Sequence, residues 1–159
     1  MPRKKTKSLT RPIPADRLYN SVAVQRVINR VMLGGKKQMA EKLMYAGMQQ
    51  AADKLKVQNP IEVFDRAMNN IRPHTETRSR RVGGANYQIP FEVKGQRQVH
   101  LTTMWFVAAV RSRGGISTDK RIAAELVDAY GGAGSAVKKK EDTHRMADAN
   151  RAFAHFARY

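Results

Sequence analysis

The lysine and arginine side chains are the residues of this sequence whose types and spacing could do chemistry. Thirty of them stand against thirteen aspartates and glutamates, which gives the 159-residue chain a formal net charge of +17. An excess of this size is typical of proteins that bind the phosphates of nucleic acid. The candidate RNA-binding residues are Arg3, Lys4, Lys5, Lys7, Arg11, Lys36, Lys37, Arg78, Arg80, Arg81, Arg97, Arg111, Arg113, Lys138, Lys139, Lys140, Arg145 and Arg151.

Metal binding and catalysis are not indicated. His74, His100, His144 and His155 include no pair four residues apart, the spacing that would place two ligands on one face of a helix. His100 falls in an apolar helical run and is interpreted as a core residue. The absence of cysteine excludes thiolate metal sites and disulfides. We therefore expect no metal and no cofactor, and without an acid, base and nucleophile set we expect no enzyme.

Two glycine-rich segments could be taken for phosphate loops. The segment at Gly34–Lys37 lacks the first glycine and the Ser or Thr of a Walker loop, and both this segment and Gly131–Ser135 follow predicted helices rather than strands. We interpret both as helix C-caps. Each would leave the N-terminal amides of the next helix, with nearby lysines, facing a phosphate of an RNA backbone.

An extended arm is predicted at about residues 72–93. Gly83 and Gly84 suit a two-residue primed turn, because both central positions of such a turn need a positive φ. The first strand carries arginines and almost no apolar residue. The second strand alternates, so one face near the base of the arm can pack; its apolar residues are Tyr87, Ile89, Phe91 and Val93. The cationic tip should therefore reach a large negative partner outside the chain.

The rest of the chain shows helical periodicity, which predicts the elements that carry the basic residues. The apolar stripes predict successive helices, one with a clear start at Asn59 and Pro60 and another, the central core helix, over Val99–Val110. The predicted fold is mainly α, a single bundle of about six helices with a protruding two-stranded antiparallel β-hairpin and a basic N-terminal tail. Residues 1–14 form the tail and residues 15–159 the domain. The helix from Ala136 onward is poor in large apolar residues and should be mostly a solvent or ligand face.

The N-terminal tail and the distribution of charge indicate what kind of partner the protein binds. Residues 1–14 have little to bury, so we expect them to be disordered when free and ordered on RNA, the alternative being a solvated terminus without fixed contacts. No lysine-rich amphipathic helix favours a membrane surface, and no apolar stretch approaches a spanning helix or a signal peptide. We expect a soluble, intracellular protein with no membrane partner.

Together, the basic clusters are expected to lack acidic partners almost fully. Several separate basic surfaces on a small body suit a folded RNA junction better than a straight duplex. Binding should be by shape and backbone, since neither a helix-turn-helix nor an aromatic ribonucleoprotein motif is visible. Two alternatives stay open: a free-standing RNA chaperone or messenger-binding regulator, and a DNA-binding module. The second is disfavoured because nothing predicts paired half-site recognition.

Two long segments of the sequence resemble one family. The stretch Ser79–Pro90 (SRRVGGANYQIP) resembles the arm signature of the bacterial-type small-subunit ribosomal protein seven family, and Ala136–Phe156 is similar to its C-terminal signature. The resemblance also covers Gly35–Lys37 and the Asn59–Glu62 cap, so it runs essentially from end to end.

The resemblance implies a cytoplasmic protein in the head of the small ribosomal subunit, with a six-helix body and a protruding hairpin. It implies binding to the 3′ major domain of 16S-type ribosomal RNA at a multi-helix junction, early in head assembly. The tail, Lys36 with Lys37, and Arg111 with Arg113 would contact ribosomal RNA. The arm around Arg78–Gly84 and the C-terminal helix would lie toward the exit-site tRNA, the mRNA path and a neighbouring head or platform protein.

Overall fold

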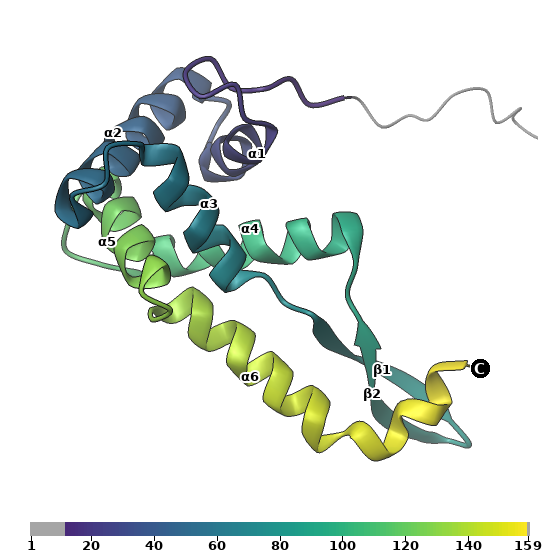
Figure 1. Ribbon diagram of the computed structural model, residues 1–159. Helices are drawn as coiled ribbons and strands as arrows, with labels where there is room; N and C mark the ends of the chain where they lie inside the picture. The colour runs from purple at the N-terminus through teal and green to yellow at the C-terminus, as the bar shows by residue number, and fades with distance from the viewer. Residues whose placement is uncertain (1–11, 159) are drawn as a thin grey trace, which may run out of the picture.

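The computed structural model describes residues 12–158, which form helices and one β-hairpin (Figure 1). The predicted fold class is confirmed. The elements in chain order are α1 (Val22–Val31), α2 (Lys37–Leu55), α3 (Pro60–Ile71), β1 (Thr75–Val82), β2 (Ala85–Glu92), α4 (Gly95–Ser112), α5 (Thr118–Tyr130), α6 (Ser135–Ala149) and the 3₁₀ helix η1 (Arg151–Arg158).

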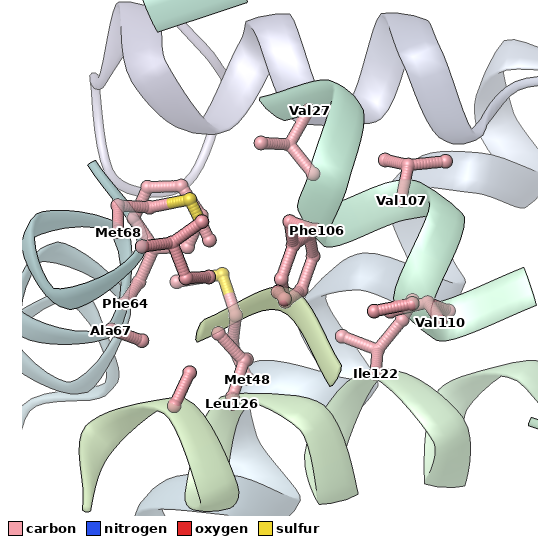
Figure 2. Close-up of a cluster of buried hydrophobic side chains, with 14 of the residues drawn as sticks. Val27, Met48, Phe64, Ala67, Met68, Phe106, Val107, Val110, Ile122 and Leu126 are labelled. Atoms are coloured by element: carbon pink, nitrogen blue, oxygen red, sulfur yellow. The ribbon is translucent and has the colours of Figure 1, made fainter. Parts of the chain in front are cut away.

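The core lies mainly among helices α1 to α5, with Ala136 and Val137 of α6 also part of it, and Figure 2 shows side chains from several of these helices converging. Phe64 of α3, Phe106 of α4 and Leu126 of α5 are fully buried there, as are Met48 of α2 and Val27 of α1. Burying such side chains contributes roughly 1.5–3 kcal/mol each. This cluster holds the body together, whereas the hairpin lies outside it.

The first helix follows a loop that is bound to the body by a single carboxylate. Asp16 accepts hydrogen bonds from the backbone N–H groups of Leu18, Tyr19 and Ser21 and from the hydroxyl of Tyr45 on α2. The Ser21 side chain then caps α1. The loop, α1 and α2 are therefore held in a fixed arrangement by the side chain of Asp16.

Helix α2 packs closely along α5. A Cβ placed on Gly47 would lie 2.6 Å from Cγ2 of Ile122, so only a glycine allows the two helices this approach. Helix α2 is covered on only part of its circumference: Met44 is fully buried, but Met39 is 57% exposed.

Helix α3 follows the sequence pattern, whereas α4 departs from it at some positions. Asn59 caps α3 by accepting from the N–H of Ile61, and Pro60 occupies the first turn, as predicted. Trp105 on α4 is buried, but Met104 is 37% exposed. An apolar run longer than one helical stripe must carry some residues on the outer face.

The hairpin projects away from the helical body (Figure 1), and α6 runs from the end of α5 toward it. Its strands are antiparallel and join through a two-residue turn between Val82 and Ala85. Helix α6 ends at Ala149 with Asn150 as its C-cap, and η1 then lies against β2. The C-terminal part of the chain therefore covers one face of the hairpin.

Candidate nucleic-acid interface

The tip of the hairpin has the predicted geometry. Gly83 and Gly84 have φ values of 59° and 91°, which a primed turn requires and which glycine adopts without strain. Arg78, Arg80 and Arg81 are exposed along β1. The tip therefore carries positive charge on a slim extension, which could enter a space between RNA segments.

One face of the hairpin is partly apolar, as the alternation predicted. Ile89 is fully buried and Val93 is 3% exposed. The guanidinium carbons of Arg78 and Arg80 lie 5.4 Å and 5.7 Å from the centroid of the Phe91 ring. Cation–π contact of this kind favours extended, ordered arginines over freely moving ones.

The expectation that the basic residues almost fully lack acidic partners is wrong at the base of the hairpin. Arg78 and Arg97 both form ion pairs with Glu76, whose side chain is only 7% exposed. Burial alone would raise the pKa of Glu76. The hydrogen bonds and charges of Arg97 and Arg78 outweigh burial and hold that pKa below its ordinary value.

The same expectation is wrong at the end of α4. Arg113 is bound to Glu125 at 2.6 Å and to Asp128, and Glu125 is fully buried. Burial alone would lower the pKa of Arg113, but the two carboxylates raise it. Arg111 is exposed and donates to the backbone oxygen of Arg30 at 3.0 Å. Of the two predicted contact residues, Arg111 therefore has the more accessible side chain.

The sequence predicts that the N-terminal amides of α6 are free to face a phosphate, but the amide of Ala136 is already hydrogen-bonded. The N–H of Ala136 donates to Oε1 of Glu125 at 3.0 Å, so a carboxylate of α5 occupies the place considered for a phosphate. The expectation of an open phosphate site is wrong at this amide. Lys138 and Lys139 are exposed beside it, whereas Nζ of Lys140 donates to the backbone oxygen of Asn70 at 2.6 Å.

The turn before α2 presents its lysines to solvent. Lys36 and Lys37 are both exposed, and no side chain caps the helix start at Lys36. Nζ of Lys37 lies 3.7 Å from the largely buried Glu41, but the Lys37 side chain itself remains 50% exposed. The turn can therefore supply two cations next to the amides of a helix N-terminus, as predicted for a phosphate contact.

The chain end packs on the hairpin through aromatic rings, which the sequence reading did not predict. The ring of Tyr87 lies 5.1 Å from that of Phe153 and 5.5 Å from that of Phe156, measured between centroids. The basic residues nearby are exposed: Arg145, 3.6 Å from Asp142, and Arg151. The sequence shows the spacing of Phe153 and Phe156, but it does not indicate that these rings pack on Tyr87 of β2.

One histidine interpretation is wrong, and two other histidines meet in the folded protein. His100 was expected in the core but is exposed on α4, where its Nδ1 lies 3.2 Å from Nη2 of Arg30. His74 and His144, far apart in sequence, meet where the hairpin joins α6: the N–H of His74 donates to Nε2 of His144 at 3.0 Å. No cluster of three metal-ligating side chains occurs within residues 12–158.

A groove between α1 and α4 adds basic residues that the sequence reading missed. Its lining includes Arg26, Arg30 and His100, and its volume is about 640 Å³. Among the described residues, Nε of Arg26 is the buried side-chain polar atom that lacks a hydrogen-bond partner. The four-residue spacing of Arg26 and Arg30, on the polar side of an amphipathic helix, is the signal that could have indicated them.

The basic groups thus lie on separate parts of the molecule: the turn before α2, the α1–α4 groove, the hairpin, and α6 with its flanks. The predicted contacts Arg3, Lys4, Lys5, Lys7 and Arg11 lie outside the described residues. None of the helices described is both long and apolar enough to cross a membrane. An arrangement of this kind can bind several phosphates that face it from different directions.

Comparison with known proteins identifies the family. The chain is 50% identical over 153 residues to small ribosomal subunit protein uS7 of Kosmotoga olearia, covering 96% of this chain and 98% of that protein. It is 50% identical over 148 residues to uS7 of Chloroflexus aggregans, covering 93% and 94%. It is 51% identical over 146 residues to uS7 of Nitratidesulfovibrio vulgaris, covering 92% and 93%. The family model of ribosomal protein S7p/S5e matches residues 2–151, and the chain therefore belongs to that family.

Proposed function

We propose that this protein binds the 3′ major domain of small-subunit ribosomal RNA at a multi-helix junction and acts early in assembly of the subunit head. The broader part of this role follows from the family: the chain is a structural, rRNA-binding constituent of the small ribosomal subunit, and not an enzyme. It is located in the ribosome, in the cytoplasm.

The match to the family over residues 2–151 is the observation that carries the proposal. The distribution of charge supports it, because the basic groups lie on several sides of the helical body and not along one stripe. A junction surrounds a protein with backbones at different angles, whereas a duplex presents one surface. Residues 15–159 would act as one helical domain, and residues 1–14 as a tail that adds contacts to the same RNA.

The hairpin and the C-terminal segment would reach toward the exit-site tRNA, the mRNA path and neighbouring head or platform proteins. Support for this second contact comes from their position: they project from the body, and Arg80, Arg81 and Arg151 are exposed on them. Because the hairpin strands do not contribute to the helical core, their surface is available for contact with a partner.

Footprinting on the isolated 3′ major-domain RNA tests the junction. Protection should cluster at one multi-helix junction, and a DNA duplex of equal length should compete poorly. Protection spread evenly along the RNA, or equal competition by DNA, would contradict the proposal.

Sedimentation of ribosomes through a high-salt sucrose gradient separates a subunit constituent from a free-standing RNA chaperone or regulator. A stoichiometric constituent should remain with the small subunit. If the protein is washed off quantitatively while the particles stay intact, the chaperone or regulator function is favoured instead.

A further inference from the structure

Glu76 is a buried carboxylate at the base of the hairpin, and it joins two arginines from different elements. Arg78 of β1 donates to Oε1 from Nε, at 2.7 Å, and from Nη2. Arg97, in the first turn of α4, donates to Oε2 from Nε at 3.1 Å and from Nη2 at 2.9 Å. Each carboxylate oxygen therefore holds one guanidinium, and β1 is connected to α4.

The arrangement leaves donors available. The side chains of Arg78 and Arg97 remain 55% and 49% exposed, whereas that of Glu76 is 7% exposed. A guanidinium has five N–H donors, and Glu76 engages only the Nε and Nη2 sides. Two positive charges against one negative leave the cluster cationic.

We propose that Glu76 is a positioning residue that presents Arg78 and Arg97 as one clamp for a backbone phosphate of RNA. Arginine suits this role because its planar donors match the oxygens of a phosphate. Fixing both side chains in advance reduces the rotamer entropy lost on binding. The inference rests on the proposed function, since it specifies how the hairpin base holds the RNA.

The clamp has a consequence for the orientation of the hairpin. Because Arg78 belongs to β1 and Arg97 to α4, a phosphate bound by both is held by the hairpin and the helical body together. RNA binding at this place would then fix the direction in which the tip projects.

The test compares Glu76→Gln with a matched control, Glu92→Gln, in binding to a 3′ major-domain transcript. Both variants raise the net charge of the hairpin by one unit, but Glu92 is 66% exposed and forms an ion pair with the exposed Lys94 at 2.8 Å. Charge alone predicts that both variants bind RNA more tightly. The clamp predicts that Glu76→Gln binds roughly fivefold more weakly, whereas Glu92→Gln stays within about twofold of the wild type.

Two further measurements separate positioning from general stability. Glu76→Asp keeps the charge and should recover part of the affinity that Glu76→Gln loses. Arg78→Gln and Arg97→Gln should each weaken binding, and the double variant should bind little more weakly than either single variant, because one clamp is lost in each case. Independent arginines would give losses that multiply.

The outcomes are distinguishable. If the wild-type protein does not bind the transcript, the proposed function fails. If it binds and a folded Glu76→Gln variant, checked by thermal unfolding, binds as well or better, only the clamp is wrong. If Glu76→Gln does not fold, the arginine double variant decides, and multiplying losses overturn the clamp.

Discussion

Asp16 is a charged side chain with an exposed fraction of only 4%, and it makes four hydrogen bonds as an acceptor. Three come from backbone N–H groups and one from the hydroxyl of Tyr45. Burial by itself would raise the pKa of Asp16, but these hydrogen bonds outweigh it and hold that pKa below its ordinary value. The ionised carboxylate is thus the form that fits the folded protein.

Asp16→Asn should destabilise the protein by about 1–3 kcal/mol at pH 7. The asparagine amide would bring N–H donors against the N–H and O–H groups that now donate to Asp16. Chemical denaturation measures this free energy of unfolding. Asp53→Asn is the control: the Asp53 side chain is exposed and accepts a hydrogen bond from the side chain of Gln49, so its change should stay within about 0.5 kcal/mol. Equal effects of the two substitutions would show that Asp16 has no special role.

The effect of Asp16→Asn should also depend on pH. The folded pKa is depressed, so the carboxylate contributes stability above its unfolded pKa, and this contribution is lost as the pH falls through the folded pKa. The difference in unfolding free energy between wild type and Asp16→Asn should be constant near neutrality and shrink below about pH 4. A difference that grows on acidification would contradict this assignment.

At the scale of elements, the close approach of α2 and α5 depends on Gly47. Gly47→Ala would place a methyl group 2.6 Å from Cγ2 and 2.8 Å from Cβ of Ile122. The two helices must separate, and we expect a loss of about 1–3 kcal/mol in unfolding free energy despite the better helix propensity of alanine. Gly114→Ala is a control, since nothing lies within 4 Å of a Cβ there and its φ is not positive.

The hairpin tip is an element without a part in the helical core. Deleting residues 80–85 should leave cooperative thermal unfolding and binding to the RNA junction largely intact, because the core side chains belong to the helices and the base of the arm. Translation by ribosomes carrying the variant should be disturbed. Loss of the cooperative unfolding transition would show that the tip supports the body.

At the scale of the whole molecule, binding to RNA should depend steeply on salt. The net charge of +17 and the separate basic surfaces imply that several phosphates are neutralised at once, which releases their counterions. A plot of the logarithm of the binding constant against that of the salt concentration should have a slope of magnitude above roughly four. A flat titration between low and moderate salt would refute this.

The sequence by itself determined the local structure and the chemistry of the partner. Periodicity located the helices, Gly83 and Gly84 specified the turn, and the charge excess indicated nucleic acid. Each of these depends on residues close together in the chain or on composition alone, so no knowledge of packing was needed. The arm and C-terminal signatures then indicated the family.

Tertiary structure alone decided which charges are paired and which faces are covered. Arg113 pairs with Glu125 and Asp128 of another helix, and Glu76 joins Arg78 to Arg97. The spacing of these residues along the chain does not indicate these ion pairs. The tertiary structure also decided that His100 lies outside the core and that η1 packs on Tyr87. Such contacts depend on how distant elements are oriented, and a one-dimensional pattern records only the separation of residues along the chain.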